Sequence, residues 1–221
     1  MGNIVGRLQS LFSPEQIDVV IGSLLGDARL ECRSVGIRYP ITARLRIHQS
    51  DKQKEYVFWK YEFLKDFVRE GPKRVKTWHD PKRAKDHYSW YFHTKSLEEL
   101  GLLHKYFYQN GIKIFPKDIS EFITPRMLAV WFMDDGANTS RSFTLNTHCF
   151  SSEEQRCIVK LLKDRFFVET TIVKDRSKLK IRIGRSDYEK FTGIVQPFII
   201  SSMTYKIVNP RNDLALIAIK G

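Results

Sequence analysis

Two apolar segments of this 221-residue chain resemble each other, and each ends in an aspartate. The first, 20–28, reads VIGSLLGDA, and the second, 128–136, reads LAVWFMDDG. In each segment the apolar run closes on Asp27 or Asp135, which is followed by Ala or Gly. One such acid in each half of the chain indicates one active site built from two similar halves.

Helix-start signals precede both segments. Ser13 can cap a helix, Pro14 suits the first helical position, and Gln16 completes a capping box. Thr124 and Pro125 repeat the signal before the second segment. Both segments are therefore predicted to be helices that are apolar on nearly all sides and buried, with an aspartate at each C-terminal end.

Small residues in the first segment predict a close helix contact. Gly22 and Gly26 lie four residues apart, on one face of the predicted helix. The second motif helix is the expected partner, through Ala129 and its neighbours. Ordinary core helices with chance glycines are the alternative, but they leave the paired terminal acids unexplained.

Segments with strict alternation predict strands after each motif. In 43–48 and 178–183, basic and aliphatic residues alternate, which indicates strands with one packed face and one open face. Segments 87–93 and 142–146 also alternate. Amphipathic helices are expected between the strands, over 51–69, 96–108, 151–166 and 186–195.

The predicted elements occur twice in the same order. Each half reads helix, two strands, helix, two strands, helix, and turn signals at Asn110-Gly111 and Pro116 mark the join. The sequence contains no low-complexity linker. We therefore expect two tightly fused halves, 1–112 and 113–221.

The net charge indicates a polyanionic partner. Lys and Arg number 37 against 25 Asp and Glu, which gives +12, and nucleic acid is the usual partner of so basic a domain. A solvated sheet face normally mixes both signs, whereas each strand row here holds three basic residues and no acid. A β-ribbon fits the DNA major groove, where Arg and Lys can read guanine. The candidate DNA contacts are Arg44, Arg46, His48, Lys178, Lys180 and Arg182, with Arg29 and Arg33 in the strand after the first motif as additions.

Several classes of protein are excluded or disfavoured. No apolar run reaches the ~18 residues that a membrane span needs, so we expect no membrane partner. The first residues lack the layout of a signal peptide. Three scattered cysteines, Cys32, Cys149 and Cys157, form no C-x-x-C, which favours a reducing, intracellular compartment over a disulfide frame or a zinc site.

Helix electrostatics predict a metal ion. The C-terminus of a helix is its negative end, so Asp27 and Asp135 are disfavoured there, and bringing them together adds repulsion. A divalent cation resolves both problems. Mg²⁺ prefers oxygen ligands and shares phosphate oxygens with its substrate, and Mn²⁺ is the expected substitute. Metal-assisted phosphodiester hydrolysis is the reaction that follows.

The two motifs resemble those of LAGLIDADG homing endonucleases, in the monomeric form with two motifs per chain. The version WFMDDG at 131–136 is similar to the subgroup of the omega-type intron endonuclease, and LNT at 145–147 and MTYK at 203–206 add to the resemblance. The resemblance covers about 13–206. It implies an α+β fold of two pseudo-symmetric αββαββα halves with saddle-shaped antiparallel sheets.

The resemblance also implies an activity and its residues. It implies a monomer that cuts both strands of a long double-stranded DNA target at a specific site and leaves short 3′ overhangs. The implied metal ligands are the carboxylates of Asp27 and Asp135, joined by the backbone carbonyls of Gly26 and Asp134. Lys113 and Lys206 match the basic residue that the family has near the cleavage centre in each half, and Gln49 is a candidate to orient water.

Three questions stay open at this point. Asp134 could be the ligand instead of Asp135, although Gly136 after Asp135 parallels Ala28 after Asp27 and favours Asp135. An intron RNA maturase and a catalytically inactive DNA-binding protein of the same fold are alternatives, but neither requires both aspartates. A prokaryotic cytoplasm and an organelle that encodes its own intron are both compatible with the sequence.

Overall fold

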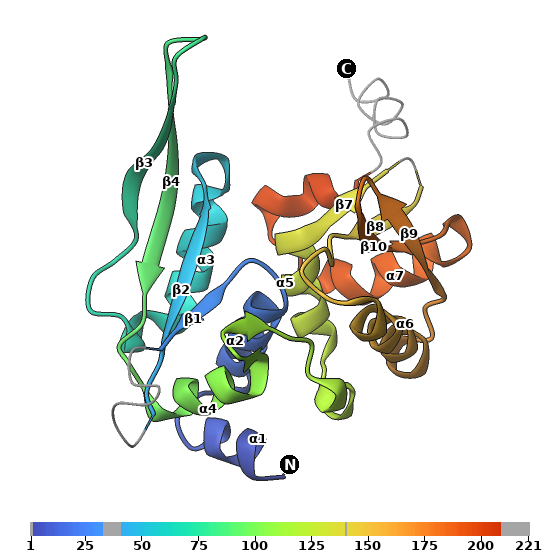
Figure 1. The fold of residues 1–221 in the computed structure, drawn as a ribbon, viewed down its shortest axis with the longest axis horizontal. Helices are drawn as coiled ribbons and strands as arrows, with labels where there is room; N and C mark the ends of the chain where they lie inside the picture. Colours follow the sequence, from blue (N-terminus) through green and yellow to red (C-terminus); the bar gives the residue numbers. More distant parts are fainter. Residues whose placement is uncertain (1, 33–40, 140, 209–221) are drawn as a thin grey trace. The chain divides into compact units, whose positions relative to one another are not determined.

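A computed structural model describes residues 2–32, 41–139 and 141–208 of the chain. It divides the chain into two compact units, Met1–Asn110 and Gly111–Gly221 (Figure 1). The predicted DNA contact Arg33 lies outside the described residues. Within the described ranges, no helix has both the length and the apolar character needed to cross a bilayer.

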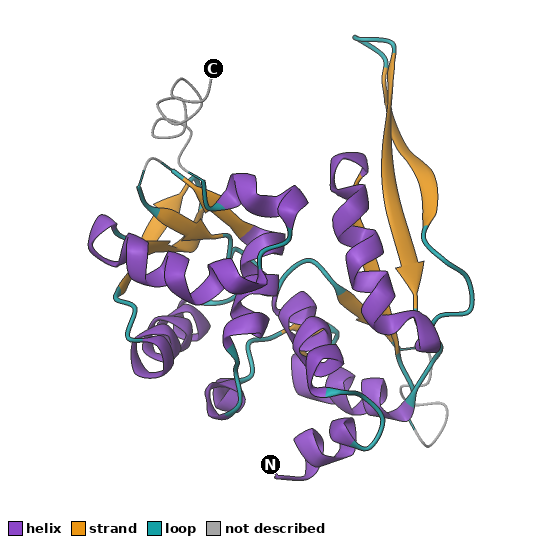
Figure 2. Ribbon diagram, turned by 180° about the vertical axis from the view of Figure 1, so that it is seen from behind, coloured by secondary structure: helices purple, strands orange, loops and turns teal. Residues whose placement is uncertain are grey.

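The first unit is a four-stranded antiparallel sheet with helices on one face (Figure 2). Its strands lie in the order β1-β2-β4-β3, and α3 and α4 pack against them. Its elements are α1 (Gly2–Gln9), α2 (Pro14–Leu25), β1 (Arg29–Glu31), β2 (Arg44–Ser50), η1 (Asp51–Gln53), α3 (Lys54–Leu64), η2 (Lys65–Phe67), β3 (Lys73–Asp80), β4 (Lys85–His93), α4 (Glu98–Phe107) and β5 (Tyr108–Gln109).

The second unit repeats this plan. Its antiparallel sheet has the order β7-β8-β10-β9, with α6 packed against β9 and β10. Its elements are β6 (Ile112–Lys113), η3 (Lys117–Glu121), α5 (Pro125–Asp135), β7 (Gly136–Asn138), β8 (Phe143–Leu145), α6 (Ser152–Phe166), β9 (Thr170–Asp175), β10 (Lys178–Ile183), η4 (Arg185–Asp187), α7 (Tyr188–Val195), η5 (Gln196–Phe198) and η6 (Ser201–Lys206). The expected order of two αββαββα halves, α2 to α4 and α5 to α7, is therefore confirmed.

Both motif segments form helices that begin where the sequence predicts. The Ser13 side chain accepts a hydrogen bond from the Gln16 backbone, and the Gln16 side chain returns one to Ser13, which completes the capping box. The Thr124 side chain caps α5 by accepting from the Met127 backbone. Side chains along both helices are buried, as their apolar character predicts.

Strand β3 is one of the elements that the sequence pattern misses, together with α1, β7 and β9. Every residue of β3 except Asp80 is exposed, so the strand has no buried face and therefore no alternation of apolar and polar residues. It pairs with β4 to form a long hairpin that extends beyond the end of α3 (Figure 1). The segment 51–69, predicted as one helix, is broken into η1, α3 and η2.

Helix α4 approaches the neighbouring backbone closely at Gly101. A Cβ added there would lie 1.9 Å from the Ile41 carbonyl oxygen, whereas a Cβ at Gly193 in α7 would meet nothing within 4 Å. We expect Gly101→Ala to lower the thermal unfolding midpoint of the chain because the backbone must move apart. Gly193→Ala is the matched control, and it should be neutral or stabilising by up to about 1 kcal/mol because Ala favours helix. Circular dichroism melting curves measure both; equal midpoints for the two variants would contradict the close approach.

Candidate functional site

In the first unit, Asp27 follows α2 and lies exposed at a hollow of about 390 Å³. Gln49 on β2 is 6% exposed, and its Nε2 donates a hydrogen bond of 3.0 Å to Asp27 Oδ2. This bond fixes the orientation of the carboxylate at the negative end of the helix. The other lining residues are Arg29, Arg46, His48, Ser50, Gln53 and Ser89.

Glu31 connects the basic residues on the open face of the first sheet. Strand pairing puts Arg29 opposite Arg46 and Glu31 opposite Arg44. The Glu31 carboxylate accepts from Arg29 at 2.8 Å, from Arg44 at 2.7 Å and from Arg46 at 3.4 Å. The open face of this sheet therefore carries an acid as well as cations. The sequence row along β2 has no acid, but β1 supplies one from the neighbouring strand.

The arginines keep Glu31 ionised. Partial burial raises the pKa of Glu31, but hydrogen bonds from Arg29 and Arg44 and the charges of Arg44 and His93 outweigh this effect and lower the pKa from 4.5 to about 2. The pKa of His48 is lowered by burial and by the charges of Arg46 and Arg29. His48 is therefore neutral at pH 7 and hydrogen-bonded to Ser89 at 2.5 Å, so the arginines carry the positive charge of this row.

The second sheet has a similar arrangement with a single acid. Lys178, Lys180 and Arg182 alternate along β10 and share one face, as predicted. Asp175 on β9 pairs with Lys178 in the strand register and accepts from Lys180 at 3.0 Å. His148 lies 3.3 Å from the same carboxylate. The hydrogen bond from Lys180 lowers the pKa of Asp175.

Asp135 and Asp134 differ in exposure. Asp135 ends α5 and is half-buried, whereas Asp134 is 7% exposed. Lys113 and Asp135 both lie close enough to Cys149 for their charges to shift the pKa of its thiol. Burial raises the pKa of that thiol, the charge of Lys113 lowers it, and the charge of Asp135 raises it.

Lys206 lies at the C-terminal end of α5. It is 7% exposed, and its Nζ donates to the carbonyl oxygens of Met133 at 2.5 Å, Asp134 at 3.1 Å and Phe132 at 3.5 Å. A cation at this position compensates the negative end of the helix. The Asp134 carbonyl, a predicted metal ligand, is thus a partner of Lys206.

Gly136 has a steric reason to follow Asp135. A Cβ at this position would lie 2.1 Å from Cδ2 of Phe132 and 2.4 Å from the Phe132 carbonyl oxygen. The helix can therefore turn directly into β7 only with glycine. Ala137 then continues β7, which pairs with β8.

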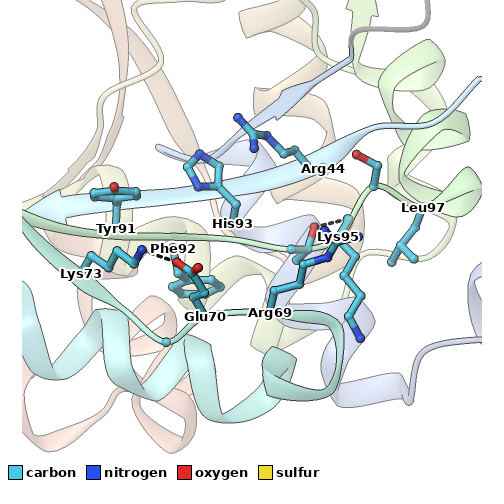
Figure 3. A pocket seen from close by; sticks show the side chains of 12 residues that line it. Arg44, Arg69, Glu70, Lys73, Tyr91, Phe92, His93, Lys95 and Leu97 are labelled. Atoms are coloured by element: carbon cyan, nitrogen blue, oxygen red, sulfur yellow. Dashed lines mark hydrogen bonds and ion pairs between the residues drawn. The ribbon is translucent and has the colours of Figure 1, made fainter.

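A basic hollow beside the first sheet has no counterpart in the sequence pattern. It has a volume of about 550 Å³ (Figure 3), and its charged and aromatic lining residues include Arg44, Arg69, Lys73, Tyr91, His93 and Lys95. Glu70 in the same wall forms an ion pair with Lys73. These cations are spread over two loops and three strands, so no single stretch of sequence shows a row of charge.

The charge on Glu31 predicts a pH dependence of stability. Because its folded-state pKa is lowered, its stabilising effect is present above pH 4.5 and is lost as the pH falls toward 2. We expect Glu31→Gln to lower the urea midpoint at pH 7, and this deficit to shrink over that pH range. Glu62→Gln, which removes an ion pair between two exposed side chains, is the control and should change little. A deficit of equal size at pH 7 and pH 3 would contradict the assignment.

Comparison with known proteins places these features in a family. The family model described as LAGLIDADG DNA endonuclease family matches residues 17–191. DNA endonuclease I-ChuI of Chlamydomonas applanata is 31% identical over 209 residues, covering 87% of this chain and 94% of that protein. Cytochrome b mRNA maturase bI2 of Saccharomyces cerevisiae is 26% identical over 220 residues, covering 95% of this chain and 50% of the maturase.

Solved structures agree with these sequence relatives. The homing endonuclease I-WcaI bound to its DNA recognition sequence superposes with a TM-score of 0.80 at 27% identity, covering 89% of this chain and 87% of that one. I-DmoI in complex with DNA and Mn shares the fold, with a TM-score of 0.54 at 15% identity over 84% and 98% of the two chains. The predicted fold class and the predicted family are confirmed. The chain belongs to the LAGLIDADG DNA endonuclease family.

Proposed function

We propose that this protein is a homing endonuclease that cuts both strands of a long DNA target and leaves short 3′ overhangs. The observation that carries the proposal is the Asp27 carboxylate, held by buried Gln49 at a hollow that also contains Arg29 and Arg46. An oriented carboxylate beside basic groups suits phosphodiester hydrolysis. The carboxylate can hold the metal ion, and the basic groups can neutralise the phosphate charge. The relatives named as DNA endonucleases support the same reaction.

The residues at the end of each motif helix fit a divalent cation, which we propose to be Mg²⁺ with Mn²⁺ as a substitute. Asp27 and the Gly26 carbonyl offer oxygen donors at the negative end of α2. Among the described residues, no three His, Cys, Asp or Glu side chains gather into a cage. Such a sparse donor set suits Mg²⁺, which retains waters and shares substrate phosphate oxygens. The bound ion would lower the pKa of an attacking water and stabilise the leaving oxygen.

In the second unit we propose Asp135 as the principal ligand. Its half-buried carboxylate is more accessible to solvent than that of Asp134. The Asp134 carbonyl oxygen already accepts a hydrogen bond from Lys206. A metal ion bound to the same oxygen would be repelled by the positive charge of that ammonium group. Lys206 is then a positioning residue that fixes the end of α5, and we propose that Lys113 contacts a phosphate near Asp135.

We propose that both sheets bind the DNA through their open faces. The contacts are Arg29, Arg44, Arg46 and His48 in the first unit and Lys178, Lys180 and Arg182 in the second. Glu31 and Asp175 hold several of these side chains in fixed positions before DNA arrives, which lowers the entropic cost of ordering them on binding.

The two halves of the proposed enzyme are 1–112 and 113–221, each with one metal-binding aspartate and one DNA-binding sheet. The compact units Met1–Asn110 and Gly111–Gly221 support this division. Because a single chain then carries both aspartates, we propose that it acts as a monomer. We further propose that an intron encodes it, in an organelle or in a prokaryote.

A maturase function is the second candidate. Its support is the similarity to cytochrome b mRNA maturase bI2, which extends over 95% of this chain. A maturase that binds RNA has no chemical need for a metal-binding aspartate in each half. Cleavage of duplex DNA therefore separates the two functions.

Aspartate substitutions test the proposed site. We expect Asp27→Asn to abolish cleavage in Mg²⁺ while DNA binding is mostly retained, because the neutral amide is a poor metal ligand. Asp135→Asn should do the same, and Asp134→Asn is the matched control that should retain activity. Cleavage of a randomised duplex library, with binding measured in parallel, provides the readout. Normal cutting by Asp27→Asn would refute the site, and failure of the wild-type protein to cut any duplex in Mg²⁺ would refute the nuclease.

A further inference from the structure

The distal part of the β3–β4 hairpin carries an exposed aromatic pair outside the proposed cleavage site. Trp78 is 56% exposed, and its ring centroid lies 5.1 Å from that of His87 with the planes inclined by 33°. Val75, on the same strand, is 37% exposed. Large apolar side chains gathered on a surface indicate a binding site, because leaving them in water forgoes the stabilisation of burial.

A β-bulge decides which face of the sheet Trp78 occupies. The strand register pairs Lys76 with Tyr88 and then Trp78 with His87, so Thr77 is the extra residue. Side chains alternate along a strand, and a one-residue insertion therefore moves the next side chain to the opposite face. The Thr77 hydroxyl donates to the His87 carbonyl at 3.1 Å, which holds the bulge in place.

Because of the bulge, Trp78 lies on the basic face of the sheet. His87 shares a face with Tyr91, four residues further along β4. Tyr91 is paired with His48, which follows Arg46 by two residues on β2. Trp78 and His87 therefore extend the same surface as the predicted DNA contacts. Without the bulge, Trp78 would share a face with Lys76 instead.

The two acids of the distal hairpin, Asp80 and Asp86, each have polar partners within the hairpin. Asp86 lies on the opposite face from His87, where its carboxylate binds His79 at 2.6 Å and Lys76 at 3.5 Å. The Asp80 carboxylate accepts from the backbone amides of the turn, at 3.0 Å from Lys82 and 3.3 Å from Arg83. Exposed cations of the turn and the start of β4 include Lys82, Arg83 and Lys85, of which Arg83 lies 4.0 Å from the Asp80 carboxylate.

We infer that Trp78 and His87 form a contact with duplex DNA at one flank of the target, with the rings against deoxyribose and base edges. Nearby lysines and arginines supply charge complementarity to the phosphates. The indole of Trp78 carries no charge, so its contact contributes to recognition of local sequence and shape without adding to the salt dependence. This inference rests on the proposed DNA-binding function and adds specificity residues to it.

The accessibility of Trp78 provides the first test. Acrylamide quenching of tryptophan fluorescence is measured on the full chain, alone and saturated with a duplex selected from a randomised library by binding. The difference between wild type and Trp78→Phe isolates Trp78 among the four tryptophans. We expect the duplex to protect Trp78 from acrylamide. Unchanged quenching of Trp78 in a protein that binds and cuts DNA would overturn the inference and leave the proposed function intact.

An exchange of neighbours provides the second test. Thr77→Trp combined with Trp78→Thr keeps composition and charge but moves the indole to the bulge position. We expect this variant and Trp78→Ala to bind the selected duplex roughly tenfold more weakly, with less discrimination at two or three adjacent base pairs. The slope of affinity against salt should be unchanged, whereas Lys85→Gln should reduce it by about one.

Wild-type affinity in the exchange variant would overturn the inference. Melting curves by circular dichroism show whether each variant is folded. If the exchange variant or Trp78→Ala does not fold, Trp78→Phe, which retains an aromatic ring, is measured in its place. A wild-type protein that binds no duplex specifically would overturn the proposed function and this inference together.

Discussion

The structure depends on the way in which two buried helices end. At the C-terminal end of each motif helix, the last carbonyl groups and an aspartate lie together, which concentrates negative charge at that helix end. In the first unit a neutral amide, Gln49, orients the carboxylate. In the second unit the ammonium group of Lys206 lies against three backbone carbonyls. The same local problem thus has two different solutions, and both leave an aspartate at the helix end.

Ion pairing organises the sheets as much as hydrophobic alternation does. The inner face of each sheet is held by aliphatic side chains such as Leu45 and Ile181, which are fully buried. On the outer faces, Glu31 forms ion pairs with three arginines and Asp175 forms one with Lys180. Side chains that would otherwise move freely are restricted to a few positions. The open faces therefore combine a high positive charge with limited flexibility, which suits recognition of a rigid duplex.

Much of this arrangement follows from sequence, and the reasons for the exceptions are physical. The starts of α2 and α5, the strands with strict alternation and the twofold repeat of the fold depend on local signals that Ser13, Thr124 and the 178–183 pattern carry. Strand β3 lacks such a signal because nearly all of it is exposed. The position of Glu31 among three arginines could not be predicted, because it depends on the register between β1 and β2. Lys206 was singled out by its motif, but its contact with α5 requires tertiary structure.

The unequal hairpins of the two units have a consequence for the DNA. Strands β3 and β4 contain 8 and 9 residues, whereas β9 and β10 contain 6 each. At about 3.3 Å per residue, the first hairpin has the longer reach. A perfectly palindromic duplex has two identical half-sites, whereas the two hairpins that would contact them differ in length. If both sheets bind one duplex as proposed, we expect the preferred target to be asymmetric, so that the protein binds it in a single orientation.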